Sequence, residues 1–203
     1  MFPSSTLGGI VIRPLTSTDV PKVRELHSMV LPVAYPSSFF TQLLLLPARV
    51  CLVAHESSSP GEPVAFISAS IRDAHPVANY FTIQNTHRRQ SGVCSATTQQ
   101  RPHIEILTLG VLPHHQNKGI ARLLVRRVHQ HFCEYLGHSQ NFDQGAVVHA
   151  NVATSNRTAL TFYERIGMQV SSDVIRNLYR TCSHGSRDGY LVVGILDRLG
   201  QYK

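Results

Sequence analysis

The chain has 203 residues, of which 42% are hydrophobic and 15% charged, so we expect one folded domain with a substantial core and exclude a wholly disordered protein. Its formal net charge of +7 indicates an acidic partner, which could be a phosphorylated cofactor, RNA or a membrane surface. The four cysteines form no CxxC pair, and we find neither a signal peptide nor an apolar run long enough to cross a bilayer, so we expect a cytoplasmic protein with no zinc site, no disulfide framework and no membrane span.

The first 72 residues predict three strands and two helices. Pro21 suits the first turn of the first helix, which is preceded by capping residues. We expect Ser37 or Ser38 to cap a second, strongly apolar helix that runs through Leu46 and is ended by Pro47. Apolar, β-branched runs predict strands over residues 9–15, 49–56 and 63–71.

The rest of the chain alternates strands and helices after one long polar segment. Residues 73–102 are rich in Gln, Ser, Thr and Arg, and we interpret them as an exposed insertion. One helix follows Gly119 and runs to about Tyr135, and a later helix ends at Gly167. The predicted strands of this half cover residues 103–111, 146–152, 168–175 and 189–196. About seven strands and about four helices predict a single α/β domain over residues 1–203 with short terminal tails.

A polar glycine turn, residues 116–121, joins the strand over residues 103–111 to the next helix. Gly119 lets the backbone approach a ligand closely, and the N-terminus of the helix offers unpaired N–H groups and a positive dipole end. Lys118 adds positive charge, so a pyrophosphate is a natural ligand. The alternative is a tight strand-to-helix connection with a solvated basic face. Neither GxxxxGK[ST] nor GxGxxG occurs, which argues against nucleotide hydrolysis and Rossmann chemistry.

Two motifs together resemble the GNAT (Gcn5-related N-acetyltransferase) superfamily. Residues 116–121 match its acyl-CoA signature, [Q/R]xxGx[G/A]. Its second signature is a strand, then Asn-x-x-Ala, then a helix that carries Phe-Tyr and ends in glycine. The matching residues are Asn156, Ala159, Phe162, Tyr163 and Gly167. The resemblance implies the GNAT fold, with a mixed sheet splayed between its fourth and fifth strands, and acetyl-CoA as the cosubstrate.

The resemblance also implies a site for acetyl-CoA along the fourth strand and the glycine turn. In the family, the splay frees the backbone of the fourth strand to hold the pantetheine amides, here at Val111 and Leu112. The turn then holds the pyrophosphate. The implied cofactor-binding residues are Leu109, Val111, Leu112, Gln116, Asn117, Lys118, Gly119, Ile120, Ala121, Asn156 and Tyr163.

Within the superfamily, "LPVAYPSSFF" (31–40), "ILTLGVL" (106–112) and "NLY" (177–179) resemble the catalytic subunit of the N-terminal acetyltransferase NatE, with the NatF type close behind. In that family, the first segment lines a pocket for the initiator Met and the hydrophobic residue after it. A tyrosine pair near the end of the chain holds the peptide backbone, although Leu178 replaces one member here. The implied substrate-binding residues are Leu31, Pro32, Val33, Tyr35 and Tyr179. The alternative for the first segment is a proline loop packed on the core.

The chain departs from the family at both positions that take up the proton of the amine. Glu105 stands where the family has tyrosine, and Asn151 stands at the family's histidine in an ungapped alignment, with His149 two residues earlier. Residues i and i+2 share a face of a strand, so both could face the cleft. Glu105 is either the general base or a charge on an exposed face, and His149 is either catalytic or packed in the sheet. Tyr163 is either the acid that protonates the leaving thiolate or a core aromatic.

We therefore expect an enzyme that transfers acetyl from acetyl-CoA to protein N-termini, with a preference for Met followed by a hydrophobic residue, by direct attack and without a metal. The alternatives are a lysine or small-amine acetyltransferase and an inactive GNAT adaptor at the ribosome. The resemblance implies nascent chains as substrates and association with NatA or the ribosome. We interpret the basic segments as solvated faces, with contact to rRNA as the alternative, and expect no DNA binding; the clustered histidines lack metal-site spacing.

Overall fold

The computed structural model describes residues 6–72, 101–136, 145–180, 182 and 185–196. The predicted insertion at 73–102 therefore lies outside the described residues except for its last two, as do most of the predicted tails. The interpretation of that segment as an exposed insertion stays a prediction.

The described strands form one mixed sheet in the order β1-β2-β3-β4-β5-β6-β8-β7. Neighbouring strands are antiparallel except for β5 and β6, which are parallel. The strands are β1 Thr6–Leu7, β2 Ile10–Pro14, β3 Arg49–Glu56, β4 Pro63–Arg72, β5 His103–Val111, β6 Ala146–Ala153, β7 Gln169–Val170 and β8 Gly189–Leu196. The predicted mixed sheet is confirmed, and β1, a pair of residues that extends the edge, is the one strand that the sequence did not indicate.

Four α-helices cover the sheet, as predicted for the described part of the chain. They are α1 Val20–Val30, α2 Ser37–Leu45, α4 Ile120–Leu136 and α5 Arg157–Arg165, with short 3-10 turns at Ser17–Asp19 and Pro113–His115. Pro36, not a serine, is the N-cap of α2. Gly167 has φ 86°, a conformation that glycine adopts without strain, and it lies just beyond the end of α5.

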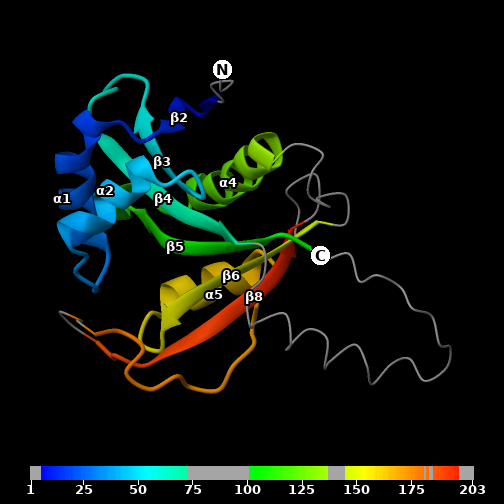
Figure 1. Ribbon diagram of the computed structural model, residues 1–203. Helices are drawn as coiled ribbons and strands as arrows, with labels where there is room; N and C mark the ends of the chain where they lie inside the picture. The colour runs from blue at the N-terminus through cyan, green and yellow to red at the C-terminus, as the bar shows by residue number, and fades with distance from the viewer. Residues whose placement is uncertain (1–5, 73–100, 137–144, 181, 183–184, 197–203) are drawn as a thin grey trace, which may run out of the picture.

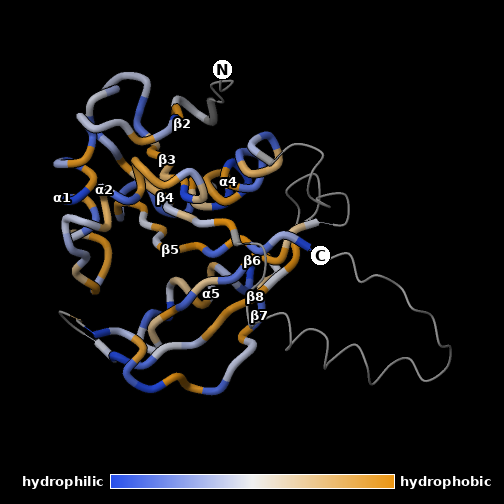
Figure 2. Tube along the Cα trace, viewed as in Figure 1, coloured by the Kyte–Doolittle hydropathy of each residue, from blue (hydrophilic) through white to orange (hydrophobic). Residues whose placement is uncertain are grey.

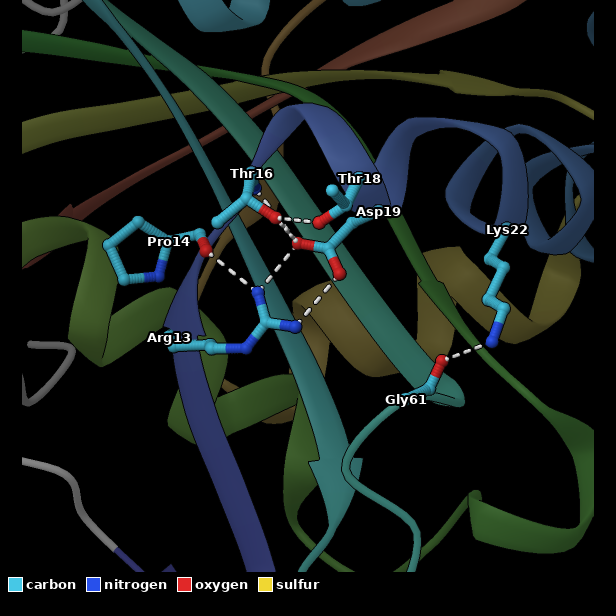
Figure 3. A network of polar contacts seen from close by, with 7 residues as sticks. All are labelled: Arg13, Pro14, Thr16, Thr18, Asp19, Lys22 and Gly61. Atoms are coloured by element: carbon cyan, nitrogen blue, oxygen red, sulfur yellow. Dashed lines mark hydrogen bonds and ion pairs between the residues drawn. The ribbon is translucent and has the colours of Figure 1, made fainter.

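The start of α1 is fixed by an ion pair beneath its first turn (Figure 3). Arg13 on β2 donates two hydrogen bonds to the carboxylate of Asp19, at 2.6 and 2.8 Å, and the backbone and hydroxyl of Thr16 donate to the same carboxylate. The hydrogen bond from Arg13 is the main cause that holds the pKa of Asp19 well below its usual range. Farther along α1, Lys22 donates to the carbonyl oxygen of Gly61 at 2.8 Å.

Two hydrophobic cores lie on opposite faces of the sheet. Helices α1 and α2 lie on one side of β3 and β4, and α4 lies on the other (Figure 1). Hydrophobic residues are concentrated along the central strands and at the sides of the helices that face them (Figure 2). The core under α4 and α5 includes Ile67, Ile104, Leu124, Phe132 and Tyr163, and the core under α1 and α2 includes Val23, Leu26, Phe40 and Phe66.

The parallel strands β5 and β6 part halfway along their length. They are paired from His103 opposite Val147 to Ile106 opposite Ala150, and the register ends there although both strands continue. This is the predicted splay between the fourth and fifth long strands of the sheet. It leaves the second half of β5 without backbone pairing to β6.

A β-bulge in β5 lies at the point of separation. Ile106 is opposite Ala69 and Thr108 is opposite Ser68, so Leu107 is an extra residue in β5. The bulge reverses the alternation of side chains, and it therefore changes which residues of β5 face α1 and α2.

The predicted strand over residues 168–175 is shorter than expected. Only Gln169 and Val170 pair with β8 in a regular ladder. The next backbone donor of β8, Leu191 N–H, binds the hydroxyl of Ser172 at 2.9 Å, which ends the ladder. The chain returns to β8 only at an isolated bridge between Ile175 and Gly189.

Candidate active site

A cleft opens where β5 and β6 part. It brings together segments that are far apart in the sequence: the loop between α1 and α2, the second half of β5, the end of β6, the start of α5 and the loop before β8. The lining residues are Leu31, Pro32, Val33, Tyr35, Ile106, Leu107, Thr108, Leu109, Asn151, Val152, Ala153, Asn156, Ala159, Tyr163 and Tyr179.

The loop between α1 and α2 forms one wall of the cleft, as the resemblance implied for a peptide-binding segment. Four of its residues, 31–33 and 35, line the cleft. The N–H of Leu31 still donates to the carbonyl oxygen of His27, so the loop starts from the last turn of α1. The ring of Tyr35 packs edge-on against the ring of His27, with 4.8 Å between the centroids. Burial raises the pKa of the Tyr35 phenol.

Tyr179 faces this loop from the other side of the cleft. Its N–H donates to the carbonyl oxygen of Arg187, and the guanidinium of Arg187 donates back to the carbonyl oxygen of Tyr179, both at 3.0 Å. Leu178, which is not among the lining residues, packs over Gly189, where a methyl group would lie 2.4 Å from its side chain. Burial, and then the nearby Tyr35, raise the pKa of the Tyr179 phenol. The single tyrosine therefore lies where the resemblance placed a peptide-binding pair.

The glycine turn lies at the N-terminus of α4, one of the longer helices of the fold. Asn117 and Gly119 have φ angles of 60° and 79°, so the backbone makes a left-handed turn before Ile120 begins the helix. The amide of Gln116 donates to the carbonyl oxygen of Val111 at 3.1 Å, which ties the turn to the end of β5. Left-handed turns before a helix direct N–H groups at an anion, so the turn fits a pyrophosphate.

A second contact fixes the approach to the turn. His115 lies 3.0 Å from the carboxylate of Glu56 at the end of β3. Glu56 has a pKa below its usual value, chiefly because of the hydrogen bond with His115, with a smaller contribution from the charge of Lys118. The turn is therefore held between β3 and β5, and Lys118 adds positive charge beside it.

Asn156 has a local role that explains its place in the motif. It is the N-cap of α5, and its side-chain oxygen accepts a hydrogen bond from the N–H of Ala159 at 3.0 Å. The same residue lines the cleft. The motif therefore fixes the start of α5 and, through it, the place of Tyr163 in the next turn.

Tyr163 lines the cleft and also belongs to the core, and its role as the acid stays a prediction. Burial raises the pKa of its phenol, and the neighbouring Tyr179 adds to this effect. A phenol with a raised pKa stays protonated at neutral pH. It can donate a proton to a leaving thiolate, and it is a poor base.

The structure separates the residues considered as general base. Asn151 lies beyond the last β5–β6 pair, is exposed and lines the cleft. His149 is only 1% exposed, and it lies within the paired part of the sheet opposite Glu105. Glu105 is half-buried and accepts a hydrogen bond from the hydroxyl of Ser70. Neither Glu105 nor His149 lines the cleft, so the role of each stays a prediction.

Sequence reasoning missed part of the cleft wall. Leu107 and Thr108 line it because the bulge brings both residues to the point of separation. A bulge is a property of strand pairing, and the alternation of residues 103–111 carries no sign of it. The predicted cofactor residues Val111, Leu112 and the glycine turn follow Leu109 along the chain and lie outside the cleft lining. A ligand that contacts both the cleft and the turn must therefore be long.

The described residues hold no group of three or more His, Cys, Asp or Glu side chains that could bind a metal. Over the same ranges, no helix has both the length and the hydrophobicity needed to cross a membrane. The expectation of metal-independent chemistry stays a prediction.

The parting of β5 and β6 beside a glycine turn at a helix N-terminus is the arrangement that the resemblance implied for an acetyl-CoA site. Residues 20–168 match the Acetyltransferase (GNAT) family, and the chain belongs to this family. The predicted superfamily is therefore confirmed. The finer assignment to the NatE or NatF type stays a prediction.

The chain is also similar to two curated proteins and to one solved structure, among others. Histone acetyltransferase MCC1 of Arabidopsis thaliana is 25% identical over 158 residues, which cover 76% of this chain and 58% of that protein. N-alpha-acetyltransferase 60 of Danio rerio is 24% identical over 165 residues, 81% of this chain and 61% of that protein. The chain thus spans about three fifths of the length of these curated relatives. The structure of Arabidopsis thaliana Naa50 in complex with the bisubstrate analogue CoA-Ac-MVNAL has a TM-score of 0.62 at 19% identity, over 91% of this chain and 97% of that one.

Proposed function

We propose that the protein transfers acetyl from acetyl-CoA to the N-terminal amine of proteins. The observation that carries this proposal is the pairing of the 31–35 loop with Tyr179 across a cleft at the splay of β5 and β6. A peptide that enters between these two walls brings its first residue to the opening between the strands. Acetyl-CoA reaches the same point from the glycine turn.

The apolar wall of the cleft supports a hydrophobic start to the peptide. Leu31, Pro32 and Val33 offer carbon atoms, and Tyr35 adds an aromatic ring that is held by His27 and Phe39. An apolar side chain that enters such a pocket is stabilised by the area it removes from water. We propose Met followed by a hydrophobic residue, and the Met-Val start of the analogue bound to the similar Naa50 supports this choice.

The chemistry is direct attack of the amine on the thioester carbonyl carbon. The site residues hold the two reactants close together in a partly enclosed space, which contributes much of the rate. Bound acetyl-CoA supplies the activated acyl group, and Gln116 to Ala121 would hold its pyrophosphate. Tyr163 protonates the leaving sulfur. We assign uptake of the amine proton to Glu105, whose carboxylate lies on the face of β5 that carries Thr108 of the cleft.

Lysine acetylation is the second candidate, and one finding favours it. A histone acetyltransferase is among the curated relatives, at an identity similar to that of the N-alpha-acetyltransferase. A catalytically inactive adaptor is the third candidate, because Glu105 and Asn151 replace the family's tyrosine and histidine. Cytoplasmic location, action on nascent chains, and association with NatA or the ribosome remain part of the proposal.

The test is steady-state turnover with a Met-Leu peptide that has a free N-terminus. Tyr179→Ala removes one wall of the proposed peptide site, and the matched control is Tyr135→Ala, at an exposed tyrosine of α4. We expect Tyr179→Ala to raise the KM for the peptide about tenfold or more, the effect of losing an aromatic contact in a cleft. The KM for acetyl-CoA should stay the same, and Tyr135→Ala should match the wild type. An equal KM for the peptide in both variants would contradict the proposed site.

A further inference from the structure

Four polar side chains form a stripe along β4 and β5 on the sheet face that carries α1 and α2. They are Ser68, Ser70, Glu105 and Thr108, and we refer to them as the polar stripe. Ser68 is fully buried, and Thr108 and Ser70 are each 5% exposed. Phe66, two residues before Ser68 and therefore on the same face, belongs to the core under α1 and α2. Hydroxyl groups in such surroundings are costly unless they are hydrogen-bonded.

The side chains of the polar stripe satisfy one another in two pairs. The hydroxyls of Ser68 and Thr108 are 2.5 Å apart, and the hydroxyl of Ser70 donates to the carboxylate of Glu105 at 3.4 Å. Ser68 and Ser70 are two residues apart in one strand, which corresponds to about 7 Å between their backbones. One water molecule with two hydrogen bonds of about 2.8 Å each reaches across about 5.6 Å, so it connects the two hydroxyls where they lean toward each other.

The β-bulge is the reason that these side chains lie on one face. Glu105 and Thr108 are three positions apart, and in a regular strand they would point to opposite faces. The extra residue Leu107 puts the side chains of Glu105 and Thr108 on the same face, so that Glu105 lies opposite Ser70 and Thr108 lies opposite Ser68. The same distortion therefore opens the cleft and brings the polar stripe to it.

Thr108 is the member of the polar stripe that lines the cleft. The described lining contains no carboxylate and no histidine. Its titratable groups are the phenols of Tyr35, Tyr163 and Tyr179, and burial raises the pKa of all three. The lining therefore has no carboxylate or imidazole that could accept a proton from an ammonium group in the cleft. The hydroxyl of Thr108 lies on the face of β5 that also carries Glu105, which is outside the cleft lining.

We infer that the hydroxyl pair Ser68–Thr108 conducts the proton of the substrate amine from the cleft to the carboxylate of Glu105. Thr108 accepts a proton from the ammonium group of the substrate as it passes its own to Ser68, and Ser70 completes the path to Glu105 through one water. The neutral amine nitrogen then forms a bond to the acetyl carbon, the carbon–sulfur bond breaks, and Tyr163 supplies the proton that the sulfur takes up. The Tyr163 phenolate takes the second proton from the nitrogen, which leaves the amide, and Glu105 releases its proton to solvent. This inference rests on the proposed function, and it names Thr108, which contacts the amine, as a catalytic residue and Ser68 as a positioning residue.

The test uses the full chain, acetyl-CoA and the Met-Leu peptide, with kcat and both KM values measured for each variant. Thr108→Val keeps the shape of the side chain and removes the hydroxyl, and Thr108→Ser keeps the hydroxyl. Ser68→Ala removes the partner hydroxyl with a small change in volume, and the melting temperature of each variant reports folding. Thr41→Val, at an exposed threonine of α2, is the matched control.

We expect Thr108→Val and Ser68→Ala to lower kcat by about 10- to 100-fold with both KM values unchanged, because general acid–base steps contribute at least that much. Thr108→Ser should restore most of the rate. The double variant Thr108→Val with Glu105→Gln should be no slower than Glu105→Gln alone, because both changes interrupt one path.

Two results would overturn the inference. Wild-type kcat in Thr108→Val, or losses that multiply in the double variant, would show that the hydroxyl pair and Glu105 do not act in one path. If the wild type acetylates no peptide at all, the proposed function itself fails, which is a different outcome from an active wild type whose Thr108 variants are equally active.

Discussion

Gly110 lies in β5 within the "TLGVL" segment and is packed under the last residue of α1. A methyl group at this position would lie 2.5 Å from a methyl carbon of Val30 and 2.7 Å from two ring carbons of Phe66. Carbon atoms in contact are normally about 3.5–4.0 Å apart, so the helix or the ring must move by about 1 Å. Phe66 is fully buried and Val30 is β-branched, so neither side chain turns aside easily.

Gly110→Ala should therefore lower the free energy of unfolding by about 2 kcal/mol, within the range of roughly 1–3 kcal/mol for an overpacked core. This corresponds to a fall of about 4–8 °C in the melting temperature of a chain of this size. Val30 is followed directly by the cleft-lining residues 31–33, so the KM for the peptide should rise while the KM for acetyl-CoA stays the same.

The assay is thermal unfolding followed by circular dichroism, together with peptide kinetics. Gly61→Ala is the matched control, since its methyl group would meet nothing closer than the side-chain nitrogen of Lys22 at 3.6 Å. We expect Gly61→Ala to unfold at the same temperature as the wild type or slightly above it. If Gly110→Ala melts with the control and binds peptide normally, the reasoning about the contact between β5 and α1 is wrong.

Four other substitutions have defined outcomes. Asn156→Ala removes the N-cap of α5 and should lower the free energy of unfolding in urea by about 1 kcal/mol. Gly119→Val places a β-branched residue at φ 79° and should weaken acetyl-CoA binding in calorimetry at least tenfold through about 1–3 kcal/mol of strain. Burial lowers the pKa of His27 to about 4. The free energy of unfolding is therefore highest above about pH 6.5 and falls by about 3 kcal/mol as the pH falls toward 4, and His27→Phe should abolish this fall. The pKa of Asp19 is held low by Arg13, so its stabilisation is present above about pH 4 and is lost in stronger acid; Asp19→Asn should remove that step.

Each of these expectations has a result that would contradict it. Equal urea midpoints for Asn156→Ala and the wild type would show that the cap does not stabilise α5. Unchanged acetyl-CoA affinity in Gly119→Val would separate the glycine turn from the cofactor. If the free energy of unfolding of His27→Phe still falls between pH 6.5 and 4 as in the wild type, other groups cause that fall. If the free energy of unfolding of Asp19→Asn still falls below pH 4 as in the wild type, Asp19 does not cause that step.

The sequence predicted well the features that depend on local chemistry. The glycine turn depends on one or two residues in a special conformation, so its position followed from the residue types. The splay and the place of Asn156 before α5 followed from the family resemblance. The structure brings the 31–35 loop and Tyr179 to one cleft, and their role in peptide binding stays a prediction.

Features that depend on strand pairing escaped prediction. The bulge at Leu107 decides that Glu105 and Thr108 share a face, and it arises from the register between β4 and β5. Whether Asn151 or His149 faces the cleft was open for the same reason, since residues i and i+2 are equivalent until the last β5–β6 pair is known. β7 ends early because the hydroxyl of Ser172 accepts the hydrogen bond of Leu191 N–H, and Leu191 belongs to β8, which is distant in sequence.

The central claim is that the acetyl group goes to a protein N-terminus, and one peptide tests it directly. A peptide that begins Met-Leu and contains one internal lysine is incubated with the protein and acetyl-CoA, and mass spectrometry of the fragments locates the added acetyl group. We predict acetylation of the N-terminal amine, because we propose that the 31–35 loop and Tyr179, which line one cleft, bind the start of a chain. Acetylation of the lysine side chain with the N-terminus left free would contradict the claim.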